Sequence, residues 1–142
     1  MKISEIMTKD VAKLDVSDTV QRAAELMKQY NVGSIPVCLG EKVVGIITDR
    51  DITLRSVAGN ENIQNQTVRE VMTSNPVVGK PEMEAHEAVR LMSERQIRRL
   101  PIVENDNIVG MVSLGDLAVE PQLTDNAGIA LENISEPSTP SV

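Results

Sequence analysis

The sequence predicts a mixed α/β fold made of two copies of one β-α-β-β-α unit. The first observation is an internal repeat, in which residues recur at a fixed offset of 65 positions without a gap, as with Met7 and Met72 or Asp51 and Asp116. The second observation is that each copy has a helical apolar pattern followed by two short strand-like runs. Self-similarity at one offset indicates a supersecondary unit used twice, so we expect any site to occur twice.

Each element follows from a local pattern. Apolar residues at i, i+3, i+4 and i+7 predict the main helix of each copy, and Thr67 followed by Glu70 is a capping-box pattern. The expected elements of the first copy are a short helix at Ile3–Met7, an extended stretch at Val11–Val16, a helix through Val20, Ala23, Ala24 and Met27, strands at Ser34–Leu39 and Lys42–Thr48, and a helix from Asp49. Those of the second copy are Val68–Met72, Pro76–Lys80, a helix through Ala85, Ala88, Val89 and Met92, strands at Arg99–Glu104 and Ile108–Ser113, and a helix from Leu114.

Turns and linkers divide the chain accordingly. Gly40-Glu41 and Asn105-Asp106-Asn107 are the expected hairpin turns. We therefore expect unit 1 at residues 1–58, a polar linker at 59–66, unit 2 at 67–120 and a C-terminal tail at 121–142. Within the tail, Asn126–Ile134 can form a short helix, whereas the proline-containing end from Ser135 is expected to be disordered.

Composition excludes several classes of function. With 142 residues and 41% hydrophobic content the chain can build a core, but Tyr30 is its single aromatic residue. The net charge of −7 and the lack of aromatic stacking platforms argue against nucleic acid as a partner. Cys38 has no partner for a disulfide within the chain. No long apolar stretch or signal pattern appears, which predicts a soluble cytoplasmic protein without membrane association.

The pattern Gly-x-x-Thr/Ser-x-x-Asp closes each copy and is the best candidate for a site. It places a hydroxyl, Thr48 or Ser113, three positions before an aspartate, Asp51 or Asp116, at a strand-to-helix junction. The hydroxyl and exposed amides suit a phosphate, and the aspartate suits the hydroxyls of a ribose. The same spacing is also a capping box, whose role is structural, and the two interpretations are compatible.

A doubled unit with an early Met-Thr, a central apolar-Pro-apolar strand and this closing pattern resembles a tandem CBS-domain pair, the Bateman module. The resemblance covers roughly residues 1–120. It implies a pseudo-two-fold disc, with small sheets packed between helices and two related clefts. It also implies a homodimer and a ligand containing adenosine, such as AMP, ADP, ATP or S-adenosylmethionine, with no cofactor required.

Matching positions carry the implied ligand contacts. Asp51 and Asp116 would hold ribose hydroxyls, while Thr48 and Ser113 would contact phosphate or sugar. The residues implied to border the adenine are aliphatic: Ala12 and Val77 in the early extended stretches, with Ile35, Pro36, Leu100 and Pro101 in the strands. Because no aromatic residue lies nearby, adenine would gain from area burial rather than from ring stacking.

The two copies differ in charge before the central strand. Repeat 2 has Arg98 and Arg99 there, whereas repeat 1 has Gly33 and Ser34. An arginine fork pairs well with phosphate, so we expect the repeat-2 cleft to favour phosphorylated ligands. The other cleft would bind weakly, hold a neutral adenosyl compound or stay empty. The alternative for the arginines is solvation or ion pairs with Glu94 and Glu104.

The remaining candidates favour structural roles. Asp49 and Asp51 are commoner as helix-dipole partners than as Mg²⁺ ligands, and Arg50 is expected to pair with a neighbouring acid. His86 reads as a surface residue and Cys38 as a small buried hydrophobe. The leading hypothesis is a regulatory, non-catalytic adenosyl-ligand sensor that acts through an unknown partner protein. The alternative is a structural or dimerisation module without a physiological ligand.

Overall fold

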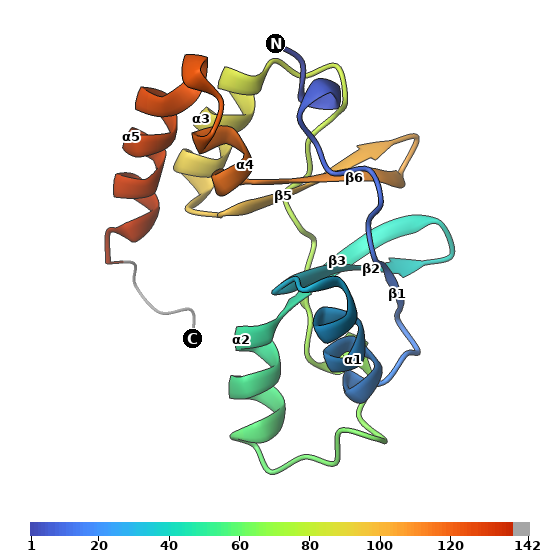
Figure 1. Cartoon of the computed structure of the whole chain (residues 1–142). Helices are drawn as coiled ribbons and strands as arrows, with labels where there is room; N and C mark the ends of the chain where they lie inside the picture. The colour runs from blue at the N-terminus through green and yellow to red at the C-terminus, as the bar shows by residue number, and fades with distance from the viewer. Residues whose placement is uncertain (138–142) are drawn as a thin grey trace. The chain divides into compact units, whose positions relative to one another are not determined.

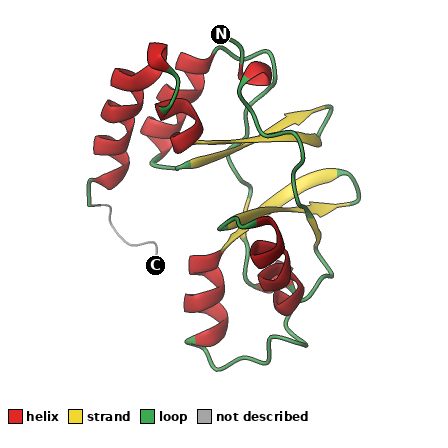
Figure 2. Cartoon of the chain, viewed as in Figure 1, coloured by secondary structure: helices red, strands yellow, loops and turns green. Residues whose placement is uncertain are grey.

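The computed structural model describes residues 1–137 of the chain, and Figures 1 and 2 show their helices and strands. The chain divides into two compact bodies. The repeat-1 body contains Asp10–Pro76 and Val103–Val109. The repeat-2 body contains Met1–Lys9, Val77–Ile102 and, among the described residues, 110–137. The predicted mixed α/β fold is confirmed, and each repeat contributes its first residues to the body of the other repeat.

Strands of the repeat-1 body form a small mixed sheet. β1 (Leu14–Asp15) runs parallel to β2 (Ser34–Leu39), and β2 is antiparallel to β3 (Lys42–Thr48). β4 (Thr73–Ser74) then pairs antiparallel with β3. The predicted bounds of β2 and β3 are confirmed at both ends. Positive φ at Gly40 (62°) allows the tight turn between them.

Helices follow from capping and from an apolar face. α1 (Val20–Tyr30) begins after Thr19, whose side chain accepts a hydrogen bond from the Arg22 N–H. It ends at Asn31, which adopts the left-handed conformation with φ 54°. Its buried residues are Val20, Ala23, Leu26 and Met27. Ala24, which belongs to the apolar pattern that predicted this helix, is exposed, and Leu26 is buried instead. α2 (Asp49–Ile52) continues into a π-helical turn at Thr53–Val57.

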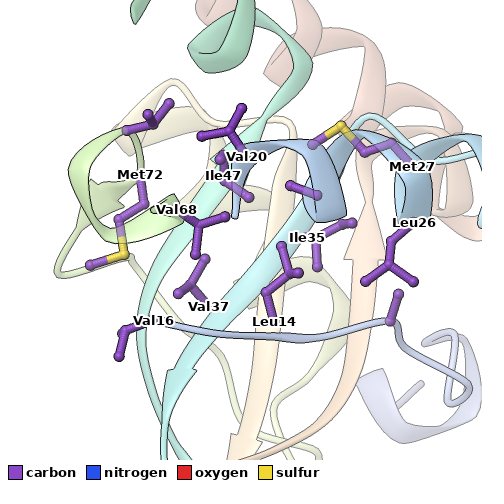
Figure 3. Close-up of a cluster of buried hydrophobic side chains, with 13 residues drawn as sticks. Leu14, Val16, Val20, Leu26, Met27, Ile35, Val37, Ile47, Val68 and Met72 are labelled. Atoms are coloured by element: carbon purple, nitrogen blue, oxygen red, sulfur yellow. The ribbon is translucent and has the colours of Figure 1, made fainter. Parts of the chain in front are cut away.

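An aliphatic core holds the repeat-1 body together. Figure 3 shows side chains from β1, α1, β2 and β3 gathered with Val68 and Met72 in one cluster. Ile35, Val37 and Ile47 are fully buried there. Because aromatic residues are lacking, the flexible methionines fill the remaining space. The core therefore depends on the segment that opens repeat 2 as well as on repeat 1.

Gly45 makes close packing of Met72 possible. A Cβ atom at Gly45 would lie only 3.0 Å from Met72 Cγ and 3.0 Å from the Thr73 carbonyl oxygen. The space that a side chain would take is thus occupied by the methionine of the Met-Thr segment. The repeat-2 body has the same arrangement between Gly110 and Met7. This explains why the Met-Thr pair and the glycine recur together.

The repeat-2 body repeats this plan. Its elements are α3 (Ala85–Arg95), α4 (Leu114–Ala118), α5 (Thr124–Ser135) and the parts of β5 (Arg99–Glu104) and β6 (Asn107–Ser113) that lie outside Val103–Val109. β5 lies beside β6, and single bridges join Gly79 to Ile102 and Thr8 to Met111. α3 buries the four predicted residues of its apolar stripe: Ala85, Ala88, Val89 and Met92.

Some expected elements differ in extent. Ile3–Glu5 and Val68–Glu70 are single 3-10 turns rather than longer helices. Pro76–Lys80 forms no strand beyond the bridge at Gly79. In the C-terminal tail, the helix over Asn126–Ile134 is confirmed and extends from Thr124 through Ser135, which we expected to lie beyond it. The expectation of disorder for residues 138–142 lies outside the described residues.

Candidate functional site

Ser113 and Asp116 form a reciprocal hydrogen-bonded pair where β6 meets α4. Ser113 Oγ accepts from the Asp116 N–H at 3.1 Å, and Asp116 Oδ2 accepts from the Ser113 N–H at 2.9 Å. This is a capping box, so the structural role foreseen for the pattern is confirmed. The box uses only part of each group, because the Ser113 hydroxyl can still donate and Asp116 Oδ1 receives no hydrogen bond from any residue of 1–137.

Thr48 and Asp51 repeat this geometry in the repeat-1 body. Thr48 Oγ1 accepts from the Asp51 N–H, and Asp51 Oδ2 accepts from the Thr48 N–H, each at 3.0 Å. Both side chains are half-buried, as are Ser113 and Asp116. The two copies of the repeat therefore share both hydrogen bonds of this capping box.

A pocket of about 530 Å³ lies in the repeat-2 body. Its lining residues are Arg98, Arg99, Ser113, Leu114, Gly115, Ala118, Thr124, Ala127, Gly128 and Leu131. This volume falls within the range of small-molecule sites. The pocket brings together three of the predicted ligand residues, Arg98, Arg99 and Ser113. Asp116 lies on α4, as Leu114, Gly115 and Ala118 do, but it does not line the pocket.

Arg98 and Arg99 are exposed at the start of β5. No carboxylate within residues 1–137 forms an ion pair with either, so the alternative of pairing with Glu94 or Glu104 is not found. The Leu114 N–H donates to the Arg98 carbonyl oxygen at 2.8 Å, which ties this end of β5 to the start of α4. Both arginines and Ser113 thus line the same pocket.

Most of the aliphatic residues expected to border adenine are buried within their own bodies. Ile35 and Leu100 are fully buried in the cores of their bodies. The neighbouring Pro36 and Pro101 are buried, Ala12 is 9% exposed and Val77 is half-buried. Neither Ile35 nor Leu100 exposes any surface to a ligand in this structure. The pocket lining includes none of these six residues.

Four pocket residues come from α5, which the sequence interpretation left without a role. Thr124, Ala127, Gly128 and Leu131 follow the spacing i, i+3, i+4, i+7. That spacing places them on one face of the helix. The signal was present in the sequence, but small residues in a tail give a weak hydrophobic pattern.

Other candidates behave as structural residues. Cys38 is 4% exposed, and burial raises the pKa of its thiol. His86 is exposed on α3, as expected. The expected ion pair of Arg50 is not found among residues 1–137. In the same part of the chain, no group of three or more His, Cys, Asp or Glu side chains is arranged to hold a metal ion. No helix of the described residues is long and apolar enough to cross a membrane.

Comparison with known proteins agrees with the repeat and the fold. A protein-family model for the CBS domain matches residues 3–57 and 68–121. The chain therefore belongs to the CBS-domain family, as its resemblance indicated. It is 48% identical over 133 residues to the CBS domain-containing protein YhcV of Bacillus subtilis (strain 168), with 94% of both chains covered.

Solved structures give the same family at lower identity. One is Hypoxic Response Protein I with two coordinated zinc ions, at 26% identity and a TM-score of 0.77, covering 84% of this chain and 98% of that one. Another is a CBS domain pair in complex with 5′-methylthioadenosine and S-adenosyl-L-methionine, at 25% identity and a TM-score of 0.74. The match to that complex covers 83% of this chain and 93% of the other.

Proposed function

We propose that this chain is a regulatory module that binds an adenosine-containing ligand and acts through a partner protein. The observation that carries the proposal is the pocket of the repeat-2 body, where Arg98, Arg99 and Ser113 surround one space of about 530 Å³. The similar CBS pair that holds two adenosyl compounds supports this ligand class. AMP, ADP, ATP and S-adenosylmethionine are the candidates.

The chemistry of the pocket favours a phosphorylated ligand. Guanidinium groups match phosphate oxygens in geometry and charge, and the Ser113 hydroxyl can donate a further hydrogen bond. Asp116, on α4 and outside the pocket lining, keeps its Oδ1 oxygen for a pair of ribose hydroxyls, because the capping box occupies only Oδ2. The capping box therefore fixes the orientation of the aspartate and leaves one of its carboxylate oxygens available to a ligand.

The base and the second site form part of the same proposal. Adenine would lie among aliphatic residues such as Val77, with the backbone near Leu100 and Pro101 supplying hydrogen bonds. In the repeat-1 body, Thr48 and Asp51 would act alike, beside Ala12, Ile35 and Pro36. Because repeat 1 lacks the arginines, its site would bind a neutral adenosyl compound, bind weakly or stay empty.

The proposed role is non-catalytic. Catalysis by a histidine or a cysteine requires a neighbouring acid or base that supports it. In the described part of the chain, no such group forms a hydrogen bond with the exposed His86 or with the buried Cys38. We propose that the module acts in the cytoplasm as a homodimer. Ligand binding would change its association with a partner through different affinities for two states.

A thermal-melt panel with AMP, ADP, ATP, S-adenosylmethionine and NAD, each near 1 mM, tests the ligand class. A ligand with a Kd of about 10 μM adds about 2.7 kcal/mol at that concentration, which raises the midpoint by several degrees. We expect a selective shift that is lost in Asp116→Asn, since asparagine keeps an oxygen for the cap but loses the charge. A flat panel would contradict the proposal.

The alternative is a structural or dimerisation module, and one observation favours it. Both capping boxes are complete without any ligand. Asp51→Asn and Asp116→Asn separate the two functions. A structural module would show no nucleotide binding beforehand and only a loss of stability in the variants. A sensor would lose binding with little change in the melting midpoint.

A further inference from the structure

α5 forms one wall of the repeat-2 pocket. Its residues Thr124, Ala127, Gly128 and Leu131 line the pocket on the helix face described above. The other lining residues include Arg98 just before β5, Arg99 in β5 and Ser113 at the end of β6. A ligand held by the arginines and filling this space therefore also contacts α5. The helix wall is mostly apolar, and the β5 side is cationic.

α5 packs on α3 and α4, and it does so through small buried side chains. Figure 1 shows α5 alongside α3, and the helix buries mainly the methyl groups of Ala127 and Ala130. Two hydrogen bonds fasten its C-terminal end: Gln96 Nε2 donates to the Asn133 carbonyl oxygen at 3.0 Å, and Asn133 Nδ2 donates to Ser93 Oγ at 2.7 Å. Small buried side chains contribute little burial energy.

The helix itself also has weak ends and a weak centre. No side chain caps its N-terminus, and no basic residue lies in its last turn. Gly128 in its interior costs about 1 kcal/mol of helix stability relative to alanine. Elements with these features open at low free energy, so a ligand that packs against the pocket face of α5 shifts the docking equilibrium measurably.

The wall belongs to repeat 2 alone. The positions 65 residues before α5 are 59–70, which form turns and the 3-10 turn at Val68–Glu70 rather than a helix. The arginines are likewise present only in repeat 2. Both asymmetries of the chain thus meet at one pocket.

Resting on the proposed function, we infer that α5 reports ligand occupancy of the repeat-2 pocket. A phosphorylated adenosyl ligand bridges Arg98 and Arg99 to the stripe of Thr124, Ala127, Gly128 and Leu131 and holds α5 docked on α3. Loss of ligand releases the helix. α5 thereby transmits the proposed signal to the partner protein.

Gly128 offers a direct test. A Cβ atom there would meet nothing within 4 Å, so an added side chain starts in open space, and the larger leucine takes up pocket volume while also favouring the helix. ATP, AMP and S-adenosylmethionine are titrated into three full-length proteins: the unsubstituted chain, Gly128→Leu and Gly128→Ala. We expect at least one ligand to bind the full chain and Gly128→Ala, and its affinity to fall at least 10-fold in Gly128→Leu.

Hydrogen exchange of the α5 amides provides the second readout. With ligand at 100 times its Kd, exchange through undocking should slow by up to about 100-fold in the full chain. Leu131→Ala should weaken this protection, whereas Ile129→Ala should not, because Ile129 is 61% exposed and lies off the pocket. The two substitutions remove side chains of the same size from the same helix, so Ile129→Ala is a matched control for Leu131→Ala.

The outcomes separate the two proposals. Binding that is unchanged in Gly128→Leu, or α5 exchange that is unchanged by ligand, overturns the role of α5 and leaves the proposed function standing. Failure of ATP, AMP and S-adenosylmethionine to bind the full chain overturns both. Loss of binding in Gly128→Leu together with ligand-dependent protection of α5 supports both.

Discussion

Replacing Gly45 by alanine should destabilise the chain, because the added methyl group collides with Met72. The Cβ atom would lie 3.0 Å from Met72 Cγ and 3.0 Å from the Thr73 carbonyl oxygen, and the latter is backbone that cannot rotate away. Overpacking of this kind costs about 1–3 kcal/mol. The lower entropy of the unfolded chain offsets about 0.4–1 kcal/mol of it. We therefore expect a net loss of about 1–2 kcal/mol.

The melting midpoint converts this loss into an observable. Unfolding entropy near 2 cal/mol/K per residue gives about 3 °C per kcal/mol for a chain of this length, so the midpoint of Gly45→Ala should fall by about 3–6 °C. Gly128→Ala is the matched control. Its added methyl group meets open space, and its midpoint should stay the same or rise.

A double-mutant cycle with Met72→Ala isolates the contact. Met72 is 8% exposed, so its truncation alone should cost about 2–5 kcal/mol. In the Met72→Ala background the extra methyl group of Gly45→Ala enters the vacated space and should cost less than in the original chain, because only the close approach to the Thr73 carbonyl oxygen remains. The expected coupling is at least about 0.5 kcal/mol. Equal cost of Gly45→Ala in both backgrounds would refute the packing of the Met-Thr segment on this glycine.

Three further outcomes are expected. The double variant Arg98→Ala/Arg99→Ala should bind phosphorylated adenosyl ligands about 10–100-fold more weakly in calorimetry, with a melting midpoint within about 2 °C of the original, because both side chains are exposed. Ser113→Ala removes the cap acceptor and should cost about 1 kcal/mol in urea unfolding, whereas Ser113→Asn should retain most of that stability. Burial raises the pKa of Cys38 above its ordinary value of 9.0, so its stabilising contribution is complete below pH 9 and is lost as pH rises through the higher folded value; urea unfolding between pH 8 and pH 11 should show a decline that Cys38→Ala lacks.

Local patterns predicted the secondary structure where short-range forces decide it. The bounds of β2, β3 and β5 agree with expectation because each hairpin turn takes positive φ at Gly40 or Asn105, which fixes the register of the flanking strands. The capping boxes were equally predictable, because in each one the hydroxyl residue comes three positions before the aspartate. By contrast, Pro76–Lys80 has the composition of a strand but finds only one bridge, since pairing depends on tertiary neighbours.

Long-range choices could not be read from the repeat. The repeat contains two equivalent glycines, Gly45 and Gly110, and the sequence does not show which of them Met7 packs against. In the structure Met7 packs against Gly110. The candidate site shows the same limit. Arg98, Arg99 and Ser113 were identified by position, but the α5 wall was missed because a stripe of small residues carries little hydrophobic signal.

Isothermal titration of the full chain with ATP and with adenosine, repeated on Arg98→Ala/Arg99→Ala, tests the central claim most directly. The account predicts that ATP binds more tightly than adenosine and that this preference disappears in the double variant, because the arginines of the repeat-2 pocket select phosphate. Equal binding of ATP by the full chain and the variant, or no binding of either compound, would contradict it.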